Sequence, residues 1–336
     1  MRQFFDTDRR LPAFTVILCA TALLFLVSAI VQPQSLSESS IQGMLPFAAI
    51  LAIAAIGQTL VIQQGGIDLS VPGVISLTVV IVTHVPDGDN SVLGRSILIA
   101  FGVAAVAGLL TGFIVSRIGI TAIVATLGMN ALLFGANLEI SGGTASRTTS
   151  DLQVFARGTV FGIDTTVVIA LVITAIVAFV VKKTIIGRRF EAVGANAAAA
   201  RAAGIQPTRY QIGAYVGANL LYCCAGILLA GIITTPSASA GETYLLPSVA
   251  AVVLGGTSLL GGVGSPVATA IGALFLSQLD QFVLTTGVSS AVQYLVQAVA
   301  LAIGIAIYSV NWKRVRDWVG HRAARDGPRG EATASS

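Results

Sequence analysis

The sequence contains very little charge. Only 10% of its 336 residues are charged, whereas 55% are hydrophobic, and the mean hydropathy is +0.87. A water-soluble domain carries about 25% charged residues, so this composition excludes a soluble fold. Between Tyr210 and Trp312 the only charged side chains are Glu242 and Asp280. The chain is therefore predicted to be an integral membrane protein.

Residue types that carry out chemistry are also scarce. The three cysteines, Cys19, Cys223 and Cys224, lie in apolar runs, and adjacent cysteines rarely satisfy disulfide geometry. The two histidines, His84 and His321, are far apart, so no catalytic or metal-binding constellation is available. No Gly-x-x-x-x-Gly-Lys-Ser/Thr sequence occurs. These absences argue against a membrane enzyme, and we expect no cofactor, metal or nucleotide-hydrolysing site in this chain.

Long apolar runs fill the chain instead. A helix of about 20 apolar residues spans a bilayer. Ten candidate runs can be placed, at 11–31, 44–63, 71–85, 96–116, 120–139, 164–182, 209–233, 245–259, 265–285 and 289–310. The third and eighth are short and interrupted by glycine, so we expect half-helices or buried helices there. The predicted fold is an all-α polytopic membrane bundle with about ten spans, and at least eight.

Basic residues cluster at three places along the chain. Arg9 and Arg10 precede the first run, and six Lys or Arg residues lie in each of the central loop and the C-terminal segment. The positive-inside rule makes all three places cytoplasmic, which fits six spans before the central loop and four after it. We predict a cytoplasmic N-terminus (1–10), a transmembrane region (11–310) and a basic cytoplasmic tail (311–336) that is partly disordered.

One glycine-rich break separates the second and third runs. It contains Gly65, Gly66, Asp68, Ser70 and Pro72, and Asp68 is the only Asp, Glu, Lys or Arg between residues 38 and 87. A carboxylate at membrane depth costs roughly 3 kcal/mol unless it faces protein or water. Asp68 and Ser70 are interpreted either as caps of the helix that Pro72 enters or as part of a gate or path. We favour capping over direct contact with a substrate.

A second glycine-rich segment, 253–266, lies on the same predicted side of the membrane. It joins two glycine pairs to Thr257 and Ser258 and ends at Pro266, where a helix is expected to begin. We predict that both segments break helices and take part in gating, through Gly65, Gly66, Asp68, Ser70, Pro72, Gly255, Gly256, Gly261 and Gly262.

The central loop, 187–209, contains a predicted short helix. Asn196 is placed to cap its start, alanines favour it, and Gly204 is placed to end it. A helix with such small side chains fits a groove on another protein. The residues alone are equally compatible with a connector that lies on the membrane surface.

Four segments in order resemble the membrane permease subunit of bacterial ABC importers for monosaccharides, of the ribose/xylose/arabinose type. They are 65–71, 126–129, 192–205 and 250–262, and the resemblance extends from about residue 44 to about 310. Phe134 stands near a position where many relatives carry arginine, and Asp280-Gln281 stands where relatives often have paired asparagines. These differences bear on the identity of the sugar more than on the transport class.

The resemblance implies a bacterial cytoplasmic membrane protein that forms the path with a second permease, identical or homologous. Its implied partners are a cytoplasmic ATPase dimer, which would use ATP and Mg²⁺, and an extracytoplasmic sugar-binding protein; no nucleic acid is expected. The ATPase would dock on the central loop, with Gly194, Asn196, Ala199, Ala200, Arg201 and Gly204 as the coupling residues.

Polar side chains inside the apolar runs are candidates for lining the path. Neutral amides suit sugar hydroxyls, because they both donate and accept hydrogen bonds. The alternative is that each amide only bonds across helices. The candidates are Asn130, Asn137, Asn219, Gln278, Asp280 and Gln281.

Two other transport classes stay open at this stage. A branched-chain amino acid-type ABC permease shares the general architecture. A proton-coupled secondary transporter shares the hydropathy and would use Asp68 and Asp280 as proton carriers.

Overall fold

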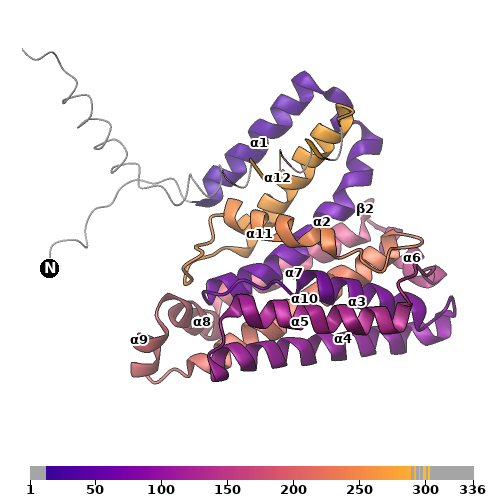
Figure 1. Ribbon diagram of the computed structural model, residues 1–336. Helices are drawn as coiled ribbons and strands as arrows, with labels where there is room; N and C mark the ends of the chain where they lie inside the picture. The colour runs from indigo at the N-terminus through magenta and orange to yellow at the C-terminus, as the bar shows by residue number, and fades with distance from the viewer. Residues whose placement is uncertain (1–12, 289–290, 293–294, 296–297, 300–301, 303–336) are drawn as a thin grey trace, which may run out of the picture.

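The computed structural model describes residues 13–288, 291–292, 295, 298–299 and 302. Nearly all of their regular structure is helical (Figure 1). The long helices are α1 (Ala13–Val31), α2 (Glu38–Gln63), α4 (Asn90–Phe113), α5 (Ala122–Ser141), α7 (Thr165–Lys183), α10 (Pro207–Ile232) and α12 (Pro266–Thr285). These seven are the helices of the described part that are long and apolar enough to cross a bilayer.

The shorter elements connect or pack between the long helices. They are the helices α3 (Val71–His84), α6 (Ser150–Arg157), α8 (Ile185–Ala195), α9 (Ala197–Ala202) and α11 (Leu245–Leu254), the helical turns η1 (Pro33–Leu36), η2 (Ile114–Ile118) and η3 (Glu242–Tyr244), and the antiparallel strands β1 (Thr159–Val160) and β2 (Ile163–Asp164). The helical bundle was therefore predicted correctly, and the small β1–β2 hairpin was not predicted.

The count of ten spans is not confirmed. The described residues give seven spans and the two short apolar helices α3 and α11, which occupy the third and eighth predicted runs. Most of the predicted tenth run, 289–310, and the segments 1–10 and 311–336 lie outside the described residues.

Two helix starts are confirmed and two boundaries are corrected. α3 begins at Val71, with Pro72 in its first turn, and α12 begins at Pro266. α2 begins at Glu38 rather than at 44, because the Ser37 side chain caps it by accepting from the Ser40 N–H. α11 ends at Leu254 rather than at 259, because the chain turns at Gly255 and Gly256, which has a φ of +74°.

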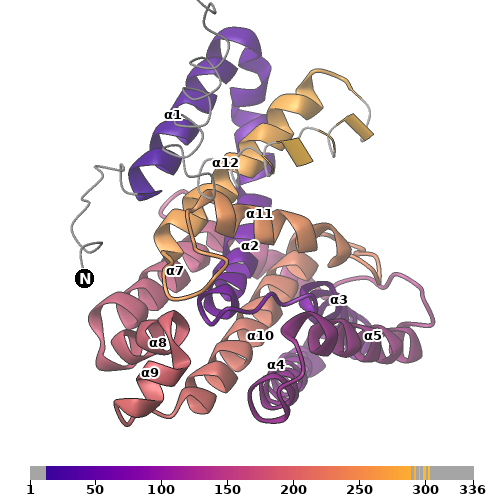
Figure 2. The same cartoon turned by 60° about the vertical axis from the view of Figure 1, so that its left-hand side comes forward.

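Helix α2 forms the centre of the molecule (Figure 2). It packs against α7, α10, α11 and α12, and its residues from Ala48 to Thr59 are all buried. Helix α3 is buried from Val71 to Thr83 between α4, α5 and α10. Close packing depends on glycine; a Cβ on Gly57 of α2, for example, would lie 2.6 Å from the Tyr222 ring of α10. Because α3 is buried on all sides by other helices, this short helix does not need to span the membrane.

The connecting segments gather at two ends of the bundle (Figure 1). At one end, here called the junction end, the segments 64–70 and 255–264 meet α8. At the opposite end, the Asn90 side chain bonds Ser150 and Asp151 at 2.9 and 2.8 Å, and Thr148 N–H donates to Thr234 C=O at 3.0 Å. Successive predicted spans cross the bilayer in opposite directions, so their connecting loops must alternate between two ends, as these segments do.

An exposed helix cap lies at the opposite end. Asp89 caps α4 by accepting from the Ser91 N–H at 2.8 Å, and this hydrogen bond lowers the pKa of Asp89.

Candidate functional site

Three segments that are distant in sequence meet at a glycine junction, formed by Gln63, Gly194, Gly261, Gly262 and Gly264. The Gly262 N–H donates to the Gln63 C=O at 2.8 Å. A Cβ on Gly194 would overlap the same carbonyl oxygen, and a Cβ on Gly264 would lie 2.7 Å from Gln63 Nε2. The end of α2, the end of α8 and the α11–α12 loop therefore touch without room for a methyl group.

The junction also requires glycine for its backbone conformation. Gly261 and Gly262 have φ values of +91° and +78°, in the left-handed region that favours glycine. A Cβ on Gly262 would lie 2.7 Å from Ala195 Cα. A further contact holds α8, because Gln64 Nε2 donates to the Phe190 C=O at 2.9 Å. The candidate coupling segment is thus joined directly to both predicted helix breaks.

Helix α9 has the caps that the sequence predicted. Asn196 Oδ1 accepts from the N–H groups of Ala198 and Ala199, each at 3.0 Å, and Gly204 has a φ of +79° just after the helix. Ala199 and Arg201 are exposed, whereas Ala200 is buried. The helix therefore presents a small, mostly alanine surface with one arginine.

The break between α2 and α3 is held by a buried carboxylate. Asp68 Oδ1 accepts from the Ser70 N–H at 2.9 Å and from the Ser70 hydroxyl at 2.5 Å, and Oδ2 accepts from Asn219 Nδ2 at 3.4 Å. Asp68 and Ser70 do not cap α3, because the Ser70 hydroxyl is bonded to Asp68 and makes no bond to the helix. The expected capping role is wrong for these two side chains, which instead lock the turn and tie it to α10.

Further side chains close this turn. With its oxygen oriented toward the Asp68 N–H, the Gln58 amide accepts from that group at 3.2 Å and donates to the Asp68 C=O at 3.3 Å and to the Tyr222 hydroxyl at 2.8 Å. The Tyr215 hydroxyl lies over the turn, where a Cβ on Gly66 would be 2.6 Å from it. Sequence analysis did not identify the two tyrosines, because an aromatic residue in an apolar run gives no signal of a polar contact.

Four of the predicted path residues make hydrogen bonds inside the bundle. Asn130 Oδ1 accepts from the Gly73 N–H at 2.8 Å, Asn137 Nδ2 donates to the Ala238 C=O at 2.9 Å, and Gln278 Nε2 donates to Ser28 Oγ at 3.1 Å. Asn219 donates to Asp68 and to the Tyr215 C=O. Their observed contacts join α5 to α3, α5 to the segment after α10, α12 to α1, and α10 to the helix break.

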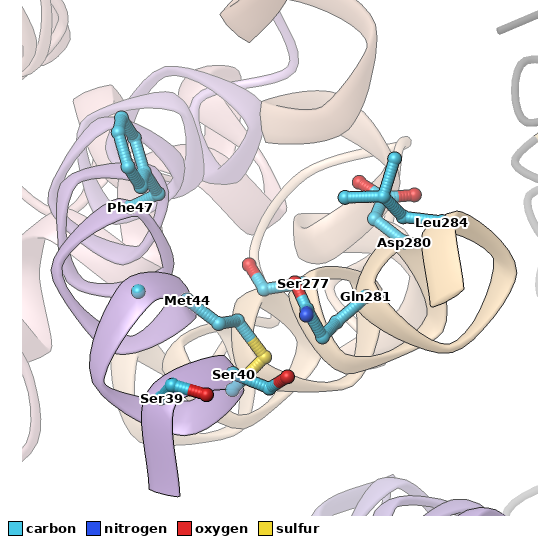
Figure 3. A pocket seen from close by; sticks show the side chains of 9 residues that line it. Ser39, Ser40, Met44, Phe47, Ser277, Asp280, Gln281 and Leu284 are labelled. Atoms are coloured by element: carbon cyan, nitrogen blue, oxygen red, sulfur yellow. The ribbon is translucent and has the colours of Figure 1, made fainter. Parts of the chain in front are cut away.

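The other two path candidates line a cavity of about 500 Å³ between α2 and α12 (Figure 3). We call it the outer chamber, because it lies toward the opposite end from the junction. The described residues that line it are Ser39, Ser40, Gly43, Met44, Phe47, Ser277, Asp280, Gln281 and Leu284. Among the described residues, no group of three or more His, Cys, Asp or Glu side chains could hold a metal ion. The chamber therefore offers hydroxyl, amide and carboxylate groups beside apolar surface.

Comparison with known proteins places these features in context. Residues 40–306 match the family described as "Branched-chain amino acid transport system / permease component". The ribose import permease protein of Escherichia coli (strain K12) is 33% identical over 296 residues, which cover 86% of this chain and 92% of that protein. The fructose import permease protein of Bifidobacterium longum is 33% identical over 287 residues, covering 81% and 80%. No solved structure matches the chain.

Proposed function

Because the chain belongs to this family of transport permeases, we propose that it is the membrane permease subunit of an ATP-driven importer for a monosaccharide. Relatives that are import permeases for ribose and fructose match it over most of both chains, which supports a sugar as the substrate. The subunit would form the translocation path across a bacterial cytoplasmic membrane, with both termini inside, and would pair with a second permease, identical or homologous. It would catalyse no reaction itself.

The energy would come from a separate partner. The chain has no phosphate-binding Gly-x-x-x-x-Gly-Lys-Ser/Thr sequence, so ATP and Mg²⁺ would be bound by a cytoplasmic ATPase dimer. An external sugar-binding protein would deliver the substrate. The exposed alanine surface of α9 is the part of the chain best suited to fit a groove on the ATPase.

The glycine junction carries the coupling proposal. A displacement of α8 and α9 reaches the end of α2 and the α11–α12 loop directly, because Gly194 packs on the Gln63 backbone and Gly262 donates to the same carbonyl group. Close-packed backbone cannot be compressed, so the displacement is passed on rather than absorbed. Closure of the ATPase would therefore move the helix breaks that flank the path.

The described lining of the outer chamber is compatible with a neutral sugar. Ser277 and Gln281 can donate to and accept from hydroxyl groups, and Met44 and Phe47 provide apolar surface beside them.

The proposal is tested by reconstituting the permease with the ATPase that co-purifies with it from its native host. We expect uptake of radiolabelled ribose, xylose, arabinose or fructose into proteoliposomes that requires ATP and persists with a protonophore. Uptake that collapses with the protonophore and ignores ATP would establish a secondary transporter instead. Uptake of leucine but of no sugar would establish an amino acid permease.

A further inference from the structure

A cluster of positive charge marks the turn from α7 into α8, here called the elbow (182–191). It contains the basic residues Lys182, Lys183, Arg188 and Arg189 and one acidic residue, Glu191. Lys182 pairs with Glu191 at 2.5 Å, and all four basic side chains are exposed in the described structure. The elbow therefore presents a net charge of +3 (4 minus 1) at the junction end of the bundle (Figure 2).

Apolar side chains are exposed in the middle of this charge. Ile185 and Ile186 are 59% and 63% exposed in the described structure, whereas Phe190 turns the other side of α8 into the bundle. The isoleucine pair extends the apolar surface of α7, on which Ile176 and Phe179 are also exposed. Aliphatic side chains among basic ones are typical of a helix that lies in the membrane interface.

The length of α7 places the elbow at the membrane surface. α7 has 19 residues, and a helix of this length rises roughly 28 Å, close to the roughly 30 Å thickness of the hydrocarbon core. Lys182 and Lys183 end the helix, so their ammonium groups reach the headgroup region. The isoleucine pair follows within three residues of Lys183, so it lies where the acyl chains begin rather than in bulk water.

The elbow is held in one arrangement by its packing on α7. A Cβ on Gly187 would overlap the carbonyl oxygens of Val180 and Val181. The Thr184 hydroxyl donates to the Val180 C=O at 2.6 Å and accepts from the Gly187 N–H at 3.1 Å. Basic groups on a rigid turn lose less freedom on binding than the same groups on a flexible loop. Setting the topology needs only the charges, whereas this turn also fixes them beside apolar side chains.

We propose that the elbow binds anionic phospholipid, with Lys183, Arg188 and Arg189 around the phosphate groups and the isoleucine pair among the upper acyl chains. Each basic residue near an anionic membrane surface strengthens binding about fivefold, so the cluster selects an anionic headgroup. The inference goes beyond the proposed function, because it concerns the lipid rather than the substrate. It gives α8 two fixed ends, the lipid at the elbow and the Gln63 backbone at Gly194.

Native mass spectrometry of the purified full-length permease tests the charge selectivity. In detergent with equal amounts of phosphatidylglycerol and phosphatidylcholine, the wild type should retain several-fold more phosphatidylglycerol. Arg188→Gln/Arg189→Gln should lower the affinity for phosphatidylglycerol at least fivefold. Arg95→Gln/Arg147→Gln is the matched control, because it removes two exposed charges at the opposite end of the bundle and should retain phosphatidylglycerol as the wild type does. Equal retention by the elbow variant and the wild type would overturn the proposal.

Fluorescence quenching tests where the elbow lies. In a permease whose three native cysteines are replaced by alanine, Ile186→Cys is labelled with an environment-sensitive fluorophore and reconstituted in vesicles. Phosphatidylglycerol brominated on its acyl chains should quench this label more strongly than equally brominated phosphatidylcholine at the same mole fraction. A label on Ala203→Cys, at an exposed site just after α9, should be quenched little by either lipid.

Two outcomes of these measurements would assign the elbow differently. An unquenched label at residue 186 would place the elbow in water and overturn the proposal. Loss of the co-purifying ATPase from Arg188→Gln/Arg189→Gln, together with wild-type retention of phosphatidylglycerol, would make the elbow a protein-docking surface instead.

Discussion

Helices α2 and α12 meet differently at their two ends. At the junction end, the end of α2 and the loop that leads into α12 are joined by backbone contact, with a 2.8 Å hydrogen bond between Gly262 and Gln63. At the other end, the same helices are separated by a cavity of about 500 Å³. The two helices are therefore fixed to each other at the junction end and are open to a cavity at the other end.

The two acidic residues of these regions show the same contrast. Asp68 is completely buried, and its two oxygens accept three hydrogen bonds from Ser70 and Asn219. Asp280 is partly exposed and lines the chamber. A carboxylate in a membrane bundle is retained either because protein donors satisfy it or because it faces water or a ligand. Asp68 fits the first case.

The largest fall in ATP-driven uptake is expected when α2 and α8 are forced apart at the glycine junction. Gly194→Ala places a methyl group on the Gln63 carbonyl oxygen, and neither backbone can move without displacing α2 or α8. Overpacking of this kind costs about 1–3 kcal/mol. We expect ATP-driven uptake to fall at least tenfold, roughly what such a cost implies, while the protein still inserts in the membrane.

Gly213→Ala is the matched control for Gly194→Ala. Gly213 lies in α10 near the junction end, and nothing lies within 4 Å of the position where its Cβ would be. The Gly213→Ala variant should transport as the wild type does, since alanine is a better helix former than glycine. Wild-type uptake by Gly194→Ala would show that the contact with Gln63 does not transmit movement.

A smaller effect on coupling, but a larger one on stability, is expected from the helix break. Asp68→Ala leaves the Ser70 N–H, the Ser70 hydroxyl and Asn219 Nδ2 without their acceptor, and each buried group left unpaired costs about 1–3 kcal/mol. The midpoint of thermal unfolding in detergent should fall, together with uptake. Asp68→Asn keeps one oxygen for Ser70 and should retain most of both. If Asp68→Asn unfolds at the wild-type temperature but does not transport, the carboxylate has a role in gating beyond its structural one.

The sequence predicted the positions of the breaks well but not how they are used. Pro72, Pro266, Asn196 and Gly204 carry local signals, because a proline starts a helix and an amide or a glycine caps one, and all four act as predicted. The meeting of Gly194 with Gln63 depends on segments 131 residues apart (194 minus 63), which no local pattern encodes.

The polar residues that face a cavity were hard to predict because this, too, depends on contacts between distant segments. An amide in an apolar run has the same local sequence whether it bonds to a neighbouring helix or faces a cavity. Asn130 and Gln281 were therefore equivalent in the sequence, and only the packing places the first against Gly73 and the second on the chamber wall.

The smallest effect on coupling is expected from a change in α9, which lies beyond the junction. Asn196→Ala removes the acceptor of the Ala198 and Ala199 N–H groups, and the loss of such a cap costs about 1 kcal/mol. A helix of only six residues has little else to hold it, so it should fray, and stimulation of the ATPase by sugar-loaded binding protein should fall severalfold. Asn196→Asp keeps the cap and should restore stimulation. If Asn196→Asp is as impaired as Asn196→Ala, the amide itself contacts the ATPase, and the transmitted movement begins at Asn196 rather than at the helix it caps.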